Sequence, residues 1–206
     1  DEETKYGMAV IGILEPGKEV TKAGSKVGDK LILTKPIGTG LITTGGKQGV
    51  VNKQTMDKAL ESMSLLNKDA AEAMMDVGVN SCTDITGFGL LGHLSEMCKN
   101  SGVSAQIKFD DLPFLDGVSE LANDGIIPDG TKRNLDYASK FVTFSDAISD
   151  SHKYMVADAQ TSGGLLIALP QNEAQAYAEN CAESTGLAAE IIGYFTPKKN
   201  SDIIVL

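Results

Sequence analysis

The sequence is poor in aromatic residues, which make up 5% of its 206 residues and include no Trp. The core of the protein must therefore consist mainly of Leu, Ile, Val, Ala and Met. Basic residues are also outnumbered, since 18 Lys and Arg stand against 28 Asp and Glu, giving a formal net charge of -10. Non-specific binding to nucleic acid or to an anionic membrane depends on clustered Lys and Arg, so we expect neither partner. Phosphate ligands stay possible, because backbone N–H groups and a divalent cation can hold them.

Cysteine is equally scarce, with Cys82, Cys98 and Cys181 far apart and no CxxC pair. This usage argues against a disulfide framework and against a zinc site, and it favours the reducing cytoplasm. No motif joins Cys82 or Cys98 to a base, so we predict no nucleophilic cysteine. The sequence also lacks an apolar run of membrane-spanning length and a signal peptide at its start. We therefore expect a soluble, cytoplasmic protein of one large domain, or one domain and part of another.

The apolar spacing predicts interleaved strands and helices. Strands are expected at residues 6–14, 30–38, 103–109, 163–170, 188–195 and 202–206. Helices are expected at residues 54–77 with a bend near 67–69, from Phe88 to a stop near Gly102, at 118–125, and at 171–186 between an Asn172 cap and a Gly186 stop. Residues 126–134 are predicted to be a loop. Because hairpins occur among these elements, the fold class predicted is α+β, a layered mixed β-sheet with packed helices.

One candidate site is the segment "DITGFGLLGH", which begins with Asp84 at the end of a predicted strand and leads into a helix. A helix N-terminus offers unpaired N–H groups, and glycines let the backbone approach an anion closely. A carboxylate at that point can hold magnesium (Mg²⁺), which prefers oxygen ligands. The alternative is an Asp or Thr cap on a tight turn. His93, one turn into the helix, is expected to be a packed or capping residue rather than a base.

A second candidate is "DAQTSGGLL", where Asp158 opens another polar, glycine-rich segment before a buried strand. On sequence alone it is either an anion-facing loop or an Asx or Ser/Thr turn. In "PDGTKRN", Arg133 could bind a phosphate or pair with a nearby acid. Lys35 could likewise face a ligand or solvent. The residues taken as nucleotide- or phosphate-facing are Thr86, Gly87, Gly89, Arg133, Thr161, Ser162 and Gly163.

Four segments occur together in a recognisable order: "LTKPIGTGLITT", "DITGFGLLGHLSEM", "GTKRN" and "QTSGGLLIALP". With this order and approximate spacing, the chain resembles the selenophosphate synthetases (selenide, water dikinases) over nearly its whole length. That family belongs to the aminoimidazole ribonucleotide synthetase superfamily. The most specific element is "TGFGLLGH", because the purine-biosynthesis relatives usually have a third glycine in place of Phe88. Ala159 stands where the family usually has Pro, which slightly loosens that turn.

The resemblance implies ATP-dependent conversion of selenide and water to selenophosphate, AMP and orthophosphate, with Mg²⁺. In this family the N-terminal domain carries the reactive Cys or selenocysteine, a catalytic Lys, most metal-binding acids and a glycine-rich nucleotide segment, and none of these motifs is present here. Residues 29–206 are therefore expected to be the C-terminal domain, with the fold of that half of the superfamily. Residues 1–28 are expected to be the last strand and linker of an N-terminal domain. The acid of "DITGFG" is the metal ligand that this half contributes in the family, which maps to Asp84.

The same resemblance implies that the partners are the chain's own N-terminal domain, ATP and selenide, and a second copy in a homodimer formed largely by the N-terminal domains. No catalytic residue is expected in this part, which should be inactive alone. Two alternatives stay open at this stage. One is another ATP-dependent synthetase of the superfamily, from purine biosynthesis or hydrogenase maturation, and the other is a noncatalytic docking domain.

Overall fold

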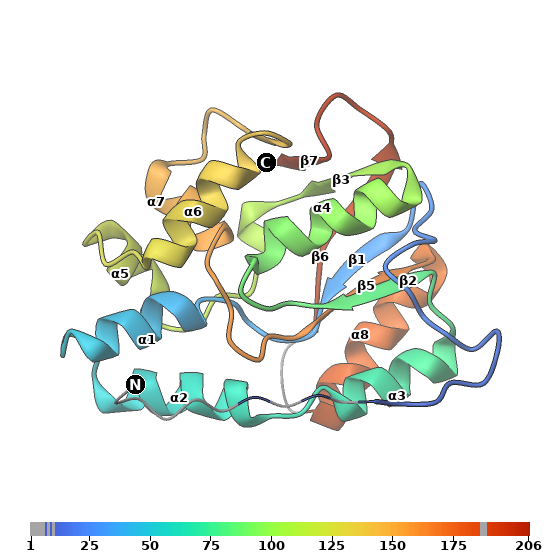
Figure 1. Ribbon diagram of the computed structural model, residues 1–206, viewed down its shortest axis with the longest axis horizontal. Coiled ribbons are helices and arrows are strands. Elements are labelled where there is room, and N and C mark those ends of the chain that lie inside the picture. Colours follow the sequence, from blue (N-terminus) through green and yellow to red (C-terminus); the bar gives the residue numbers. More distant parts are fainter. Residues whose placement is uncertain (1–6, 8, 10, 186–188) are drawn as a thin grey trace.

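The computed structural model describes residues 7, 9, 11–185 and 189–206. Within these residues seven strands form one sheet in the order β2-β5-β1-β6-β3-β7-β4 (Figure 1). The strands are β1 (Lys30–Leu33), β2 (Ser81–Asp84), β3 (Val103–Ile107), β4 (Val142–Phe144), β5 (Leu165–Leu169), β6 (Glu190–Pro197) and β7 (Ile203–Val205). Strand β7 pairs in parallel with β3 and β4, whereas the other pairings are antiparallel. The predicted mixed sheet is therefore confirmed.

Eight α-helices and one 3₁₀ turn accompany the sheet in the described part of the chain (Figure 1). They are α1 (Thr39–Lys47), α2 (Lys53–Ser64), α3 (Lys68–Val77), α4 (Gly89–Ser101), the 3₁₀ turn (Phe109–Asp111), α5 (Val118–Asn123), α6 (Asp129–Ala138), α7 (Asp150–Val156) and α8 (Gln171–Thr185). Helix α4 ends at Gly102 in a left-handed conformation, as the sequence predicts.

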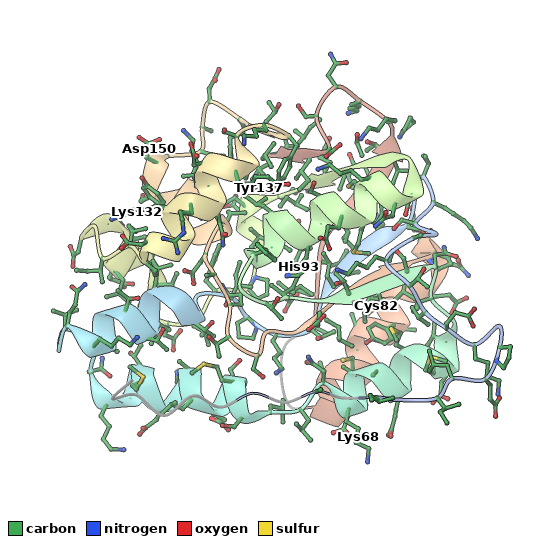
Figure 2. All side chains as sticks on the ribbon, viewed as in Figure 1. Lys68, Cys82, His93, Lys132, Tyr137 and Asp150 are labelled. Carbon is green, nitrogen blue, oxygen red and sulfur yellow. The ribbon has the colours of Figure 1, made fainter. Side chains whose placement is uncertain are left out.

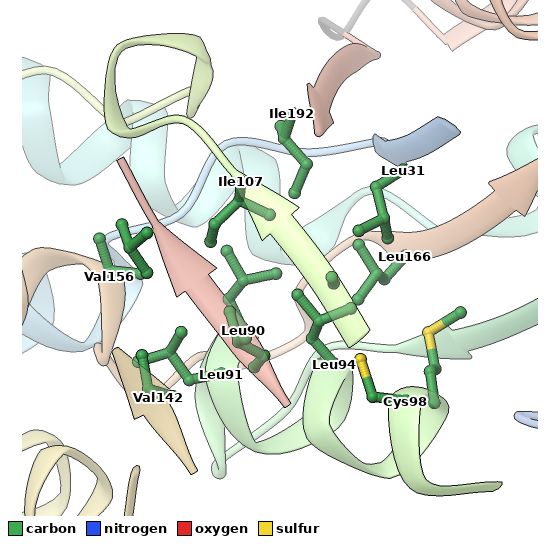
Figure 3. Close-up of a cluster of buried hydrophobic side chains, with 14 of the residues drawn as sticks. Leu31, Leu90, Leu91, Leu94, Cys98, Ile107, Val142, Val156, Leu166 and Ile192 are labelled. Atoms are coloured by element: carbon green, nitrogen blue, oxygen red, sulfur yellow. The ribbon is translucent and has the colours of Figure 1, made fainter. Parts of the chain in front are cut away.

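The core has two layers because side chains alternate across the central strands. In β1, Leu31 and Leu33 face a cluster with α4, whereas Ile32 faces a cluster with α3 and α8. Strand β5 alternates in the same way, and all five of its residues are buried. Figure 3 shows the first cluster, in which Leu90, Leu91 and Leu94 of α4 pack onto the sheet. A third cluster joins α1, α2, α5 and α7 at one end of the molecule.

Several predicted elements need correction. The helix predicted over residues 54–77 is two helices, because α2 ends at Ser64 and α3 begins at Lys68. The predicted loop at 126–134 contains the start of α6, for which Pro128 is the N-cap, so its Pro and Gly initiate a helix rather than a turn. Asn172 lies inside α8 and its side chain donates to Glu173, so it is not the cap. The predicted stop at Gly186 lies outside the described residues.

The segment predicted as a strand at residues 6–14 is described only at residues 7, 9 and 11–14, and no strand is assigned there. Ile11 and Ile13 are 94% and 100% exposed, so the expected buried face is wrong for this chain by itself. A strand needs a neighbouring strand for its hydrogen bonds, and this segment pairs with none among the described residues. Further along, Thr21 meets the sheet, since its carbonyl accepts the Cys82 N–H at 2.9 Å.

Candidate metal- and phosphate-binding site

Asp84 is the last residue of β2, which lies at the edge of the sheet. Its backbone is held by pairing with Leu165 of β5. Its side chain is exposed, and the carboxylate has no hydrogen bond or ion pair among the described residues. The structure therefore presents a free carboxylate on a fixed backbone.

The turn after Asp84 is held by the second glycine-rich segment. The Ile85 N–H donates to the Gly164 carbonyl at 2.9 Å, and the Gly163 N–H donates back to the Ile85 carbonyl at 3.1 Å. The Thr86 carbonyl accepts the Gln160 N–H at 3.2 Å. Residues 84–89, which we call the metal turn, and residues 158–164, the glycine strap, thus form one hydrogen-bonded unit.

His93 holds the metal turn from the other side. Its Nε2 lies 3.2 Å from the Thr86 backbone nitrogen and 3.0 Å from the Thr86 hydroxyl. The imidazole is buried, and Figure 2 labels it beneath α4. Burial, together with the Lys22 ammonium, lowers the pKa of His93, although Glu96 and Asp84 act in the opposite direction. A packed, capping histidine is what the sequence predicts here.

Asp158 opens the glycine strap but does not face solvent. One carboxylate oxygen accepts the N–H groups of Gly40 and Leu41 at 2.9 and 3.3 Å, and the other accepts the Thr131 hydroxyl at 2.7 Å. Asp158 is therefore placed at the N-terminus of α1, where the helix dipole favours a negative charge. Burial nevertheless raises the pKa of Asp158 to about 6, against the lowering effect of these hydrogen bonds. This carboxylate has a capping role.

Gln160 completes the same cap. Its Oε1 accepts the N–H groups of Gly38 and Thr39 and the Thr39 hydroxyl, at 3.0 to 3.1 Å. The first N–H groups of α1 are thus occupied by side chains of the glycine strap. They are not available to a ligand.

Two glycines allow the segments to come this close. A Cβ on Gly40 would lie 2.4 Å from the Ala159 carbonyl oxygen, and one on Gly89 would lie 2.6 Å from that of Asp158. Gly89 also has φ +67°, which favours glycine. By contrast, a Cβ on Gly87 meets nothing within 4 Å. Gly89 is therefore needed for packing, whereas Gly87 leaves open space beside Asp84.

Lys35 and Asn67 support the exposed tip of the glycine strap from inside. The sequence predicts that Lys35 faces either a ligand or solvent, and the structure shows neither. The Lys35 ammonium is buried and donates to the carbonyls of Leu65 and Ser162 at 2.6 and 3.0 Å. Burial lowers the pKa of Lys35. The Asn67 side-chain amide donates to the Gly163 carbonyl at 2.9 Å. Ser162 has φ 51°, an unusual value for a non-glycine residue, which these contacts hold in place.

Arg133 is exposed and has no ion pair among the described residues, so pairing with a nearby acid is not seen there. It lines a groove of about 400 Å³ between α4 and α6, together with Phe88 and Tyr137. Figure 2 labels Tyr137. The residues of "GTKRN" that touch the site are Thr131, which binds Asp158, and Asn134, which donates to the Gly87 carbonyl at 2.9 Å. A wider hollow of about 670 Å³ between α6 and α7, near the labelled Lys132 and Asp150, includes no residue of the metal turn or the glycine strap (Figure 2).

The donor set fits one magnesium ligand and not a complete magnesium site. Among the described residues no three His, Cys, Asp or Glu side chains are grouped to hold a metal ion. Asp84 offers a hard carboxylate oxygen of the kind Mg²⁺ prefers, and further ligands have to come from elsewhere. Burial raises the pKa of the Cys82 and Cys98 thiols to about 12, so neither is a thiolate near neutral pH. No described helix is long and apolar enough to cross a bilayer.

The sequence profile of the family described as "AIR synthase related protein, C-terminal domain" matches residues 26–206. The chain belongs to this family. It is 45% identical, over all of its residues, to "Selenide, water dikinase 2" of Peptoclostridium acidaminophilum, and 44% identical to the selenide, water dikinase of Clostridioides difficile. The chain spans 59% of the length of each of these relatives.

Solved structures agree on the AIR synthase related fold. A thiamine-monophosphate kinase from Stenotrophomonas maltophilia is similar with a TM-score of 0.65 at 14% identity, over 93% of this chain and 54% of that one. A hydrogenase maturation protein HypE is similar with a TM-score of 0.65 at 17% identity, over 90% of this chain and 49% of that one. At these identities the likeness concerns the fold.

The structure brings together most of the predicted site residues of this AIR synthase related domain. Thr86, Gly87 and Gly89 share the metal turn, and Thr161, Ser162 and Gly163 lie on the glycine strap beside it. The sequence did not single out Gln160, Thr131, Asn134 and Asn67, which make the connecting hydrogen bonds. Only their position in the sequence could have pointed to these four residues, since each lies within or next to a quoted motif or at a helix boundary.

Proposed function

We propose that this chain is the C-terminal part of a cytoplasmic selenide, water dikinase, which forms selenophosphate, AMP and orthophosphate from ATP, selenide and water. In this proposal residues 29–206 are the C-terminal domain, and residues 1–28 are the last strand and linker of an N-terminal domain. The observation that carries the proposal is Asp84, an unpaired carboxylate on a turn that is hydrogen-bonded to the glycine strap at Ile85 and Thr86. Support comes from the 45% identity to a protein named selenide, water dikinase.

Each part of the site has a task in this reaction. Bound Mg²⁺ would neutralise the negative charge of the transferring phosphoryl groups. Asp84 would supply one of its oxygen ligands. The open backbone at Gly87 and the exposed strap residues Thr161 and Ser162 would face the phosphates. The buried Lys35 ammonium adds positive charge beneath the strap, which favours an anion above it.

Asp84→Asn in the full-length protein tests the proposal. We expect selenide-dependent AMP formation to fall by at least about 100-fold, because the amide removes the charge of a metal ligand. The fold should be unchanged, since the carboxylate has no partner among the described residues. Asp76→Asn is the matched control, because Asp76 is also exposed and makes the same change of charge on α3. Near-normal activity of Asp84→Asn would overturn the assignment.

Product analysis of the full-length protein tests the reaction itself. Selenophosphate formed from selenide is the expected product. A phosphorylated amide or a cyclised ribonucleotide would indicate another ATP-dependent synthetase of the superfamily. No turnover of ATP by the full-length protein would indicate a noncatalytic docking domain.

A further inference from the structure

We infer that His93 is a positioning residue, which fixes the metal turn by accepting the Thr86 N–H at Nε2 and therefore carries its own proton on Nδ1. The inference rests on the proposed role of Asp84, because the metal turn matters for activity only if Asp84 binds the metal.

The first step is the tautomer. A backbone N–H can only donate, so the 3.2 Å contact with Thr86 requires a lone pair on Nε2. A neutral imidazole with a bare Nε2 must have its hydrogen on Nδ1. An imidazolium would put two N–H groups against each other. The Thr86 hydroxyl, 3.0 Å from Nε2, can donate or accept, so it is the backbone N–H that points to the tautomer with hydrogen on Nδ1.

The second step is what the contact does. Asp84 and Thr86 are separated by one residue, so a hold on Thr86 fixes the chain that follows Asp84 and adds to the β5 pairing that holds the backbone of Asp84 itself. The Thr86 carbonyl is already bound by the N–H groups of Gly89 and Gln160. Its N–H and hydroxyl both meet His93, and no other side chain among the described residues is bonded to them. His93 therefore completes the hold on this residue.

The third step is that the imidazole makes no competing hydrogen bond. Nδ1 is buried and has no partner among the described residues, so the Thr86 contact is the hydrogen bond that orients the ring. The Phe88 ring meets it edge-on, with centroids 6.1 Å apart. The charged groups that face His93 are Lys22, Glu96 and Asp84, and Lys22 pairs with Glu96 at 2.5 Å. In this tautomer the Nδ1–H is a buried donor without a partner among the described residues, at a cost of about 1–3 kcal/mol, so the side chain is better explained by orientation than by a gain in stability.

Nitrogen-15 NMR of the imidazole nitrogens in the full-length protein tests the tautomer without any metal. This chain has two histidines, so the difference from a His93→Gln sample assigns the His93 signals, and His152 is the internal control. His152 stacks on Phe109, and its ring has no hydrogen bond among the described residues that selects a tautomer. We expect the hydrogen of His93 on Nδ1. A hydrogen on Nε2, or a mixture of both forms, would overturn the inference.

Manganese binding tests the consequence. Mn²⁺ bound to the full-length protein with ATP is measured by electron paramagnetic resonance for His93→Leu and His93→Gln. We expect His93→Leu to weaken Mn²⁺ binding about 10-fold, the lower range for outer partners of metal ligands. His93→Gln should stay within about 3-fold of wild type, because its amide oxygen can accept the Thr86 N–H. Wild-type affinity of His93→Leu, or equal losses in both variants, would overturn the inference.

Asp84→Asn is measured in parallel to separate two failures. Loss of Mn²⁺ binding in Asp84→Asn with none in His93→Leu contradicts the role of His93 alone. Unchanged binding in Asp84→Asn contradicts the proposed function and the inference with it.

Discussion

Asp84 and Asp158 look alike in the sequence, since each opens a polar, glycine-rich segment, yet the structure gives them opposite environments. Asp84 is exposed and its carboxylate has no partner among the described residues. Asp158 is 1% exposed and its carboxylate accepts hydrogen bonds from Gly40, Leu41, Thr131 and Gln160. An acid followed by glycines can therefore be a metal ligand or a helix cap, and only its hydrogen-bond partners in the folded protein distinguish the two.

The position of Asp84 also depends on Asp158. Asp158 holds α1 and α6 against the glycine strap, and the strap holds the metal turn on which Asp84 sits. The buried acid therefore supplies the rigidity and the exposed acid supplies the free charge. Mutation of Asp158 should therefore lower stability, whereas mutation of Asp84 should affect ligand binding and leave stability nearly unchanged.

Replacing each acid by Ala should give the largest contrast in stability. Asp158→Ala leaves the Gly40 N–H and the Thr131 hydroxyl without an acceptor, and we expect a loss of about 2–4 kcal/mol in the free energy of unfolding. Asp84→Ala should change it by less than about 0.5 kcal/mol, as for most exposed sites. Urea unfolding of the full-length protein measures both. Equal losses would show that the two environments do not differ as described.

Alanine at Gly89 and at Gly87 sharpens the contrast within the metal turn. We expect Gly89→Ala to cost about 2–3 kcal/mol, because it strains a positive φ and its Cβ meets the Asp158 carbonyl. Gly87→Ala has open space and should cost less than about 1 kcal/mol. Thermal unfolding compares the two variants. A larger loss at Gly87 would contradict the packing described for the two segments.

The pH dependence of stability offers the smallest effect. Because burial raises the pKa of Asp158 in the folded state to about 6 from its ordinary value of 3.8, the folded state binds this proton more tightly than the unfolded state does. The stabilising contribution of the protonated carboxyl is thus present at low pH and is lost as the pH rises through 6. Asp158→Asn removes this titration. Its stability relative to wild type should improve by about 2 kcal/mol between pH 4.5 and pH 7. Urea unfolding at the two pH values measures this change. If the difference in free energy of unfolding between Asp158→Asn and wild type is the same at both, the raised pKa of Asp158 is contradicted.

Local patterns predicted most of the fold. The apolar spacing located β1, β3, β5 and the helix that ends at Gly102, because these elements are stabilised by their own periodicity and termination signals. It missed α1, whose sequence TGLITTGGK contains three glycines and predicts a poor helix. That helix is capped by Asp158 and Gln160, more than a hundred residues away, and no local pattern reports such a partner.

The candidate site was predictable to a similar degree. Asp84 and the two glycine-rich segments were found from residue types and from the family resemblance. Their contact through Ile85, Thr86 and Gln160 was not, because backbone hydrogen bonds between distant segments leave little trace in residue identity. Arg133 of "GTKRN" shows the same limit, since its charge predicts a phosphate contact, whereas Thr131 and Asn134 make the hydrogen bonds to the site.

The hydrogen bond from the Cys82 N–H to the Thr21 carbonyl has a consequence for how the proposed two-domain enzyme assembles its site. It attaches the chain to the outer edge of β2, two residues before Asp84. Anything joined upstream of Thr21 is thereby tethered near the metal turn, and a short tether corresponds to an effective concentration in the millimolar range. In the proposed enzyme, even a weak contact between the two halves would then be enough to bring them together.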